Sequence, residues 1–191
     1  MIKYKSKLLS SVEGISYNFG SKSSMPIKED VFTLNQIHSD KVIFLKNTDK
    51  NYEPFDGDAI ITTQKRFNIG VKTADCVPIL LTDINATFVA AIHSGWRGTY
   101  HKIIVNVLDL IFKELMIKPE NIIGCLGPSI SLENYEVSED MCIKFKKKFI
   151  NSDSFIKEKN NKFFIDLSRI NIFLLKSLGV SKIDIINECT Y

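Results

Sequence analysis

Short apolar runs separated by polar turn residues fill the first half of the chain, a pattern typical of β-strands. These runs are rich in β-branched and aromatic side chains. Six strands are predicted: residues 31–34, 41–45, 58–62, 68–73, 77–81 and 87–92. The last two runs are almost wholly apolar, so we expect both faces of these strands to be buried. Asp83-Ile84-Asn85 predicts the turn that joins them.

The hydrophobic period changes after residue 98. Apolar side chains then recur every three and four residues up to Leu115, which predicts an amphipathic helix over 98–115 with Thr99 as its N-cap. Helices are also predicted at 138–149 and 166–178, strands at 122–126 and 182–187, and a polar surface loop at 151–162. This irregular mixture predicts an α+β fold, with mixed β-sheet layers flanked by helices, and the length predicts a single domain over residues 1–191.

Composition and charge narrow the function classes. The formal net charge is only +3, and we interpret the lysine cluster at 144–148 as the solvated face of a helix rather than a nucleic-acid surface. No apolar run is long enough for a membrane span, and residues 1–11 lack the apolar core of a signal peptide. We therefore expect a cytoplasmic monomer without a membrane or nucleic-acid partner. Its four widely spaced cysteines are expected to be thiols.

Two histidines and one cysteine stand out as metal-competent residues. His38, Cys76 and His93 lie in three distant segments, whereas structural zinc sites usually take ligands in close pairs. Three protein ligands from a folded scaffold are typical of a catalytic zinc site with an open position, and one copper ion could occupy the same ligands. Two alternatives remain: a half-buried thiol with two hydrogen-bonded imidazoles, or a nucleophilic Cys76 paired with a histidine.

The segment after His93 reads His93-Ser94-Gly95-Trp96-Arg97-Gly98-Thr99, a strand that runs through a glycine-rich turn into a helix. A helix start offers free N–H groups and Arg97 offers a guanidinium, so Arg97, Gly98 and Thr99 are predicted to bind phosphate. A core Trp96 with an ion-paired Arg97 is the alternative.

Four further polar residues could contribute to the site or to the turns around it. Asp75 directly precedes Cys76 and could orient a histidine, carry a proton or cap a turn. Gln36 is a candidate substrate contact close to His38. Asp56 and Asp58 flank Gly57, which indicates a turn rather than a pair of catalytic carboxylates.

Several motifs occur in an order that resembles one bacterial family. They are Asn35-Gln36-Ile37-His38-Ser39-Asp40, Thr73-Ala74-Asp75-Cys76-Val77-Pro78, Ile92-His93-Ser94-Gly95-Trp96-Arg97-Gly98-Thr99, Gly127-Pro128-Ser129-Ile130 and Tyr135-Glu136-Val137. This family was long labelled multicopper polyphenol oxidase or laccase domain. It is now better described as purine nucleoside phosphorylases, and one branch is named peptidoglycan editing factor.

The resemblance implies an α+β fold of sheets layered against helices and a zinc ion held by His38, Cys76 and His93. It also implies phosphorolysis of adenosine, inosine and methylthioadenosine, with purine nucleoside and phosphate as partners, and deamination of adenosine. Cys76, His93 and Asp75 are then the expected catalytic residues. A laccase needs many imidazoles for its copper cluster, and the three histidines of this chain cannot supply them.

Two other functions stay open. The editing branch implies hydrolysis of an amide in a cell-wall precursor that carries the wrong amino acid, and a non-catalytic zinc-binding protein is the other alternative. Relative to the family, the region before His38 is short and has Lys22 where arginine is common. The chain also stops at Tyr191, where family members continue into an aromatic and arginine-rich tail. Substrate choice is expected to depend on both regions.

Overall fold

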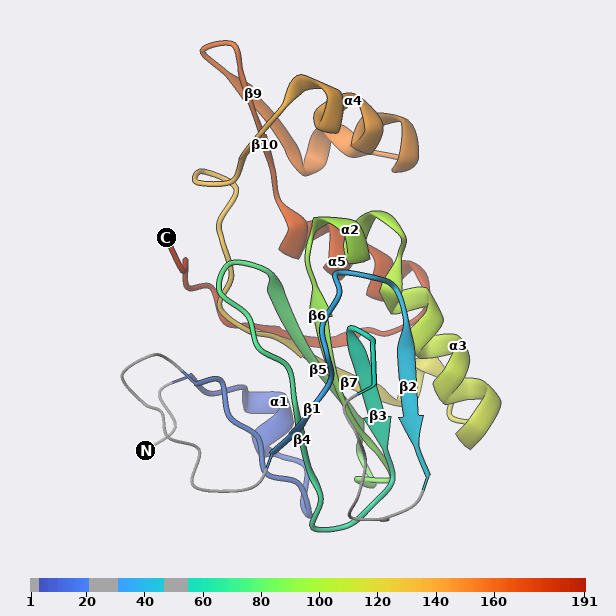
Figure 1. Cartoon of the computed structure of the whole chain (residues 1–191). Helices are drawn as coiled ribbons and strands as arrows, with labels where there is room; N and C mark the ends of the chain where they lie inside the picture. Colours follow the sequence, from blue (N-terminus) through green and yellow to red (C-terminus); the bar gives the residue numbers. More distant parts are fainter. Residues whose placement is uncertain (1–3, 21–30, 47–54) are drawn as a thin grey trace.

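A six-stranded mixed sheet organises the computed structural model, which describes residues 4–20, 31–46 and 55–191 (Figure 1). Lys22 lies outside these residues. The strand order is β11-β7-β5-β6-β3-β2. The strands are β2 (Val42–Leu45), β3 (Ala59–Thr62), β5 (Val77–Asp83), β6 (Val89–Ser94), β7 (Ile122–Leu126) and β11 (Lys182–Ile185). Both edge pairs are parallel and the inner pairs antiparallel, so the predicted mixed sheet is confirmed.

The two most apolar strands lie at the centre of this sheet. All but one residue of β5 and all but one residue of β6 are buried, which confirms the expectation of burial on both faces. The turn predicted between them is present, because Ala86 N–H donates to the carbonyl of Asp83 and Thr87 N–H donates to its carboxylate. Apolar side chains on both faces of the sheet must be shielded from water, and different elements pack on each face.

Helices cover one face of the sheet. The buried faces of α3 (Ile103–Leu115) and α5 (Leu167–Ser177) pack against β-strand residues such as Ile79 and Ile92 in the largest core cluster. The opposite face is covered by the short helix α1 (Lys7–Ser10) and by a parallel pair formed by β1 (Val31–Thr33) and β4 (Asn68–Gly70). Among the described residues, no helix has the length and apolarity that crossing a membrane requires.

The single helix predicted over 98–115 is two helices, and this prediction was wrong. Helix α2 (Trp96–Tyr100) has Gly95 as its N-cap, and α3 begins only after Lys102, whose φ of 61° lies in the left-handed region. Thr99 is therefore inside α2 rather than at its N-cap. The apolar period of α3 identified that helix correctly, but hydrophobic spacing carries no signal for the left-handed residue that breaks the backbone.

A small lobe lies at one end of the molecule, at the top of Figure 1. It contains α4 (Glu139–Lys148) and a three-stranded antiparallel sheet of β8 (Glu136–Val137), β10 (Lys162–Ile165) and β9 (Ile156–Lys159). Short 3-10 turns occur at Pro119–Asn121 and Ser152–Ser154. The surface loop predicted at 151–162 is largely the β9 hairpin, so that prediction was also wrong. Three of the four β9 residues are exposed, so the strand lacks the apolar alternation that would reveal it.

Aromatic rings anchor the lobe to the body. Tyr100 of α2 contacts Phe145 of α4, and the series continues through Phe149 and Phe155 to Phe173 of α5, with ring centroids 5.5–6.5 Å apart. Lysines 144, 146, 147 and 148 lie on the exposed face of α4, as the sequence predicted.

Candidate metal centre

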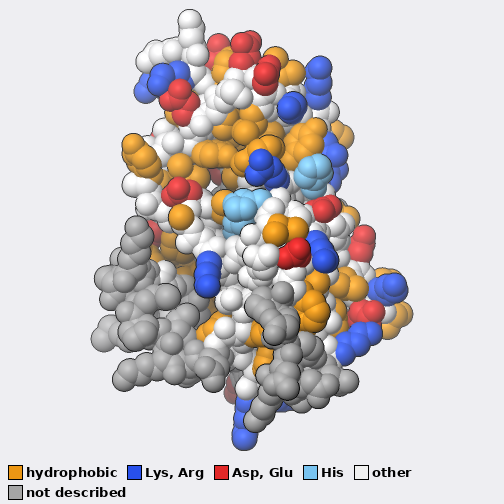
Figure 2. All heavy atoms as spheres, in the orientation of Figure 1, with side chains coloured by type: hydrophobic (Ala, Val, Ile, Leu, Met, Phe, Trp, Pro, Cys, Tyr) orange, Lys and Arg blue, Asp and Glu red, His pale blue; other side chains and the backbone are white. Residues whose placement is uncertain are grey.

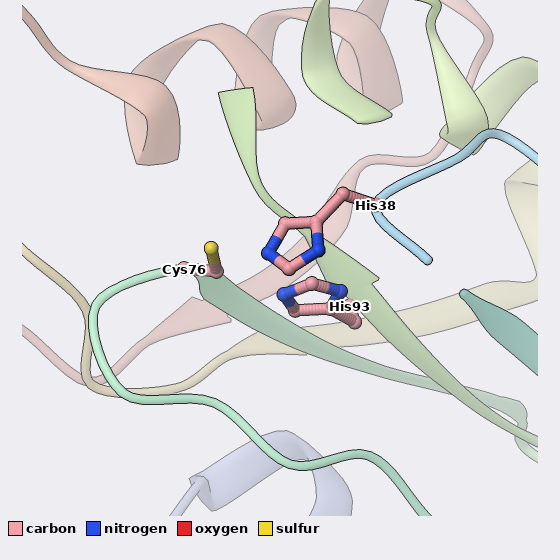
Figure 3. A group of neighbouring side chains, drawn as sticks. All are labelled: His38, Cys76 and His93. Atoms are coloured by element: carbon pink, nitrogen blue, oxygen red, sulfur yellow. The ribbon is translucent and has the colours of Figure 1, made fainter. Parts of the chain in front are cut away.

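The fold brings His38, Cys76 and His93 together from three segments (Figure 3). One ligand atom from each lies within 4.8 Å of the others. His93 is in β6, Cys76 directly precedes β5, and His38 lies in the loop before β2. Antiparallel pairing of β5 with β6 sets Pro78 opposite His93, which brings the start of β5 beside the ligand strand. His38 is exposed, Cys76 half-buried and His93 buried, so the triad opens to solvent on the His38 side.

Asp58 orients His93. The Oδ1 atom of this fully buried carboxylate lies 2.8 Å from His93 Nδ1, and the backbone carbonyl of Asp58 accepts a hydrogen bond from His93 N–H at 2.7 Å. A carboxylate oxygen accepts, so Nδ1 carries the proton and Nε2 keeps a free lone pair for a metal. Burial lowers the pKa of His93, although the hydrogen bond and charge of Asp58 oppose this shift. The neutral, metal-binding form of the ring is thus favoured.

The same carboxylate holds the His38 loop. His38 N–H donates to Oδ1 at 3.0 Å, and both the N–H and the hydroxyl of Ser39 donate to Oδ2, at 2.6 and 2.7 Å. His38 has φ 58°, a left-handed conformation that costs about 1–2 kcal/mol for a residue with a side chain. Burial alone would raise the pKa of Asp58, but the hydrogen bonds from His93 and Ser39 hold this pKa below its usual value.

Sequence reasoning missed this role of Asp58, because Asp56-Gly57-Asp58 resembles a turn. The role of Asp58 follows from the register of β3 against β6. The β3–β6 pairing sets Ala59 opposite Ile92 in antiparallel strands, which brings the residue before Ala59 next to the residue after Ile92. The proximity of Asp58 and His93 can be inferred only when the strand pairing is known, and a single sequence does not specify that pairing.

Cys76 packs directly on the backbone of Gly95. A Cβ placed on Gly95 would lie 2.8 Å from Cys76 Sγ and 3.5 Å from Cδ2 of His38, so only glycine leaves room for both side chains. Burial raises the pKa of the Cys76 thiol, and the negative charges of Asp75 and Asp58 raise it further. Tyr135 is close enough that burial and the charge of Cys76 raise its pKa to about 12.

Asp75 and Gln36 both have protein partners. The carboxylate of Asp75 accepts a hydrogen bond from Thr190 Oγ1 at 2.8 Å, and its backbone carbonyl accepts one from Ile130 N–H. The amide of Gln36 bonds both backbone groups of Lys72: Nε2 donates to the carbonyl at 2.8 Å and Oε1 accepts from the N–H at 2.7 Å. Gln36 thereby joins the loop that carries His38 to the segment that leads to Cys76.

Arg97 and Thr99 lie in different environments within α2. The guanidinium of Arg97 is exposed and stacks on Trp96, 4.6 Å from the ring centroid, and no carboxylate of the described residues forms an ion pair with it. Thr99 is fully buried: its N–H donates to the Gly95 carbonyl and its hydroxyl contacts Ser94 and Asn171. Arg97 is therefore open to an anion, whereas the polar groups of Thr99 are already engaged.

The donor set suits a zinc or copper ion. Two imidazoles and one thiol are borderline and soft ligands, and the carboxylate behind His93 completes the carboxylate–histidine pair common at such centres. His38 is the exposed member of the triad, and Figure 2 shows histidine side chains on this face beside hydrophobic side chains. A metal held here would thus be open to a substrate on the His38 side.

Comparisons with known proteins place these residues in a family context. The family described as multi-copper polyphenol oxidoreductase laccase matches residues 15–191. A purine nucleoside phosphorylase of Rickettsia conorii is 33% identical over 166 residues, which cover 85% of this chain and 67% of that protein. One from Aquifex aeolicus is 37% identical over 163 residues, covering 85% and 72%, and one from Bacteroides thetaiotaomicron is 37% identical over 138 residues, covering 70% and 51%.

Solved structures of other proteins align with a similar share of this chain. A Neisseria meningitidis protein aligns with a TM-score of 0.74 and 31% identity, covering 84% of this chain and 64% of that one. A hypothetical protein of Bacillus licheniformis aligns with a TM-score of 0.76 and 23% identity, covering 85% and 66%, and it shows the shared fold alone. The chain thus spans about half to three quarters of the length of the relatives it matches.

Proposed function

We propose that this chain, which belongs to the family described as multi-copper polyphenol oxidoreductase laccase, is a metal-dependent purine nucleoside phosphorylase. The observation that carries the proposal is the His38–Cys76–His93 triad oriented by Asp58. It occurs in a chain whose relatives bear the name purine nucleoside phosphorylase. Proposed substrates are adenosine, inosine and methylthioadenosine, with phosphate as the second substrate and a monomer as the working form.

Zinc is the proposed metal, and His38, Cys76 and His93 would hold it. When bound, zinc supplies a positive charge that polarises a substrate oxygen or lowers the pKa of a water molecule. The chain has only three histidines, and a multicopper oxidase needs many more imidazoles than that. We therefore propose a site for one metal ion and not the multicopper cluster that the family's description names. A single copper ion in place of zinc remains an outcome for metal analysis.

The protein's own groups would bind and orient the substrates. Arg97 is exposed, free of carboxylate partners in the described chain and positioned over the Trp96 ring, and a guanidinium can bind phosphate through two parallel hydrogen bonds. We therefore propose that Arg97 and the neighbouring backbone of Gly98 bind phosphate. Thr99 and Gln36 have buried or backbone partners, and we propose positioning roles for them in place of substrate contact.

Proton movement would fall to groups beside the triad. Asp75 is exposed and its charge reaches Cys76, so it is the proposed proton carrier. Asp58 keeps a proton on Nδ1 of His93 and thereby fixes which ring nitrogen faces the metal. The same combination of metal triad and nearby carboxylate suits deamination of adenosine, which we propose as a second activity.

The test combines metal analysis with release of free base from adenosine and inosine, with and without phosphate. About one zinc per chain and phosphate-dependent base release are expected, consistent with three protein ligands for one ion. Cys76→Ala should abolish both metal binding and turnover while the fold persists. Arg97→Ala should raise the KM for phosphate about tenfold or more and leave metal content unchanged. Lys182→Ala, on edge strand β11, is the matched loss of one positive charge and should change neither.

Each contrary outcome points elsewhere. Bound metal without base release would contradict the phosphorylase and leave amide hydrolysis in cell-wall precursors or a non-catalytic role. Absence of metal would contradict the metal centre and favour Cys76 as a nucleophile. Full activity of Cys76→Ala would exclude the triad from the reaction.

A further inference from the structure

Three buried polar side chains lie behind the metal centre. Ser94 at the end of β6, Thr99 in α2 and Asn171 in α5 are each 0% exposed. Ser94 Oγ lies 2.9 Å from Asn171 Oδ1 and 3.0 Å from Thr99 Oγ1, and Asn171 Nδ2 lies 3.0 Å from Thr99 Oγ1. The three side chains therefore form a closed triangle of hydrogen bonds, which we call the polar ring.

The direction of every bond in the polar ring follows from its partners. Asn171 Nδ2 also donates to the backbone carbonyl of Leu167 at 2.8 Å, and a carbonyl can only accept, so the amide orientation is fixed. Ser94 must then donate to Asn171 Oδ1, which leaves Thr99 to donate to Ser94. Each hydroxyl gives one hydrogen bond and receives one. Such a ring is fully satisfied, and its bonds reinforce one another in a low-dielectric interior.

The polar ring holds both ends of the turn on which the metal ligands rest. Ser94 directly follows His93, and Thr99 closes the glycine-rich segment. Between them, the Cα of Gly95 supports Cys76 Sγ and the His38 ring, while Gly98 lies so close to the Ser39 carbonyl that an added Cβ would sit 3.2 Å from it. A shift of this turn would therefore move His93 directly and remove the support beneath Cys76 and His38.

Apolar packing already accounts for the docking of α5. Ile170, Leu174 and Leu175 are buried in the main core cluster on the same helix. A buried polar group adds little to the net free energy of unfolding compared with a well-packed apolar residue, yet it demands one specific arrangement of its partners. The contribution of Asn171 is thus better explained by geometry than by stability alone.

We propose that Ser94, Thr99 and Asn171 are positioning residues: their polar ring ties the turn that supports His38, Cys76 and His93 to helix α5. This inference rests on the proposed metal centre but not on the phosphorylase activity. It assigns a role in the site to a helix that contributes no metal ligand, and it explains why the hydroxyl of Thr99 is buried away from substrate.

The test uses Thr99→Val, which keeps the side-chain shape and removes the hydroxyl from the polar ring. Co²⁺ affinity and absorption spectrum are measured on the full chain, together with the rate at which iodoacetamide alkylates Cys76 in the metal-free protein. Thr99→Ser restores the hydroxyl. Thr82→Val is the control, because Thr82 is equally buried, donates to the Phe88 carbonyl at 2.7 Å, and lies about 20 Å along β5 from Cys76.

We expect Thr99→Val to lower Co²⁺ affinity about tenfold or more, the scale measured when groups that orient metal ligands are removed, and to change the Co²⁺ absorption bands. Alkylation of Cys76 should accelerate about fivefold as the turn opens locally. Thr99→Ser should return all three readouts toward those of the unaltered chain. Thr82→Val should lower the unfolding temperature without changing any of the three.

The inference is overturned if Thr99→Val loses stability yet keeps the Co²⁺ affinity, the spectrum and the Cys76 alkylation rate of the unaltered chain. If Thr99→Val does not fold, Ser94→Ala removes a hydroxyl from the same ring without adding a methyl group and is judged by the same criteria. Failure of the unaltered chain to bind Co²⁺ would instead contradict the metal centre, and the alkylation rates would still decide the role of the polar ring. Loss of phosphorolysis alone bears only on the proposed function.

Discussion

A single carboxylate, that of Asp58, holds two of the three metal-competent residues. It bonds the side chain of His93 and the backbone of His38, and both contacts leave the metal-facing atoms free. In Asp58→Asn one acceptor oxygen becomes an NH₂ donor, which must face an N–H group. We expect metal affinity to fall about 10–100-fold, as for other residues that orient metal ligands. Buried donors left unpaired should lower the free energy of unfolding by about 1–3 kcal/mol.

The control is Asp56→Asn at the same turn. Asp56 accepts a hydrogen bond from Asn35 Nδ2 at 2.6 Å and contacts neither histidine. Chelator competition should show unaltered metal affinity in this variant. Equal affinities in the two variants would mean that Asp58 has no specific role in holding the ligands.

Cys189 is the thiol that the structure predicts to be most reactive. Hydrogen bonds from Ser131 and Asn134 lower its pKa to about 7, and its side chain is exposed. Thiolate is the reactive form, so the rate of alkylation should reach half its maximum near pH 7. Asn134→Ala should move that midpoint upward. Mass spectrometry of alkylated peptides gives the profile, with Cys125 as the internal control because burial raises its pKa to about 12. A Cys189 midpoint near 9 would contradict the prediction.

At the scale of elements, the turn between β6 and α2 determines whether the ligands fit together. Gly95 has φ −74° and ψ −177°, which alanine adopts without strain, so its need for glycine comes only from contact with Cys76 and His38. Gly95→Ala should therefore fold but bind metal about tenfold or more weakly, because its Cβ displaces Cys76 Sγ. Urea unfolding of the metal-free protein and metal titration provide the measurements.

A double variant separates the two causes. In a Cys76→Ala background the sulfur is absent, so Gly95→Ala should cost less stability there than in the unaltered chain. An identical cost in both backgrounds would show that the sulfur contact is not what requires glycine.

The sequence predicts an element well when the side chains of that element themselves carry the hydrophobic pattern. The strands β5 and β6 and the helix α3 were predicted because their own side chains carry the hydrophobic pattern. The break at Lys102 and the hairpin strand β9 were missed, because the first depends on one left-handed residue and the second packs few apolar side chains. The triad was identified from residue chemistry, whereas Asp58 and Asn171 require knowledge of strand register and helix packing.

For the whole molecule, the buried site links protonation to stability. His93 has a folded-state pKa below its usual 6.5, so the unfolded chain binds this proton more readily than the folded protein does. The contribution of His93 to the free energy of unfolding of the metal-free protein is complete above pH 6.5 and is lost as the pH falls below that value. The pKa of Asp58 is lowered from 3.8, so its contribution is lost as the pH falls below 3.8. Cys76 has the opposite shift, so its contribution is lost as pH rises above 9.

We therefore expect the free energy of unfolding of the metal-free protein to decline between pH 7 and pH 5. His93→Gln cannot titrate and should show a shallower decline. Urea unfolding at several pH values measures both curves, and parallel curves would contradict a titrating His93.

The order in which the ring and the triad are made has a consequence for the living cell. His38, Cys76 and His93 all precede Asn171 in the sequence, and ribosomes add about 5–20 residues per second. A nascent chain therefore presents its imidazoles and thiol for several seconds before the helix that closes the polar ring has been synthesised. If the polar ring has the proposed role, an ion captured in that interval would meet an unfixed turn and exchange readily. The completed chain, and not the first ion encountered, would then determine which metal is kept.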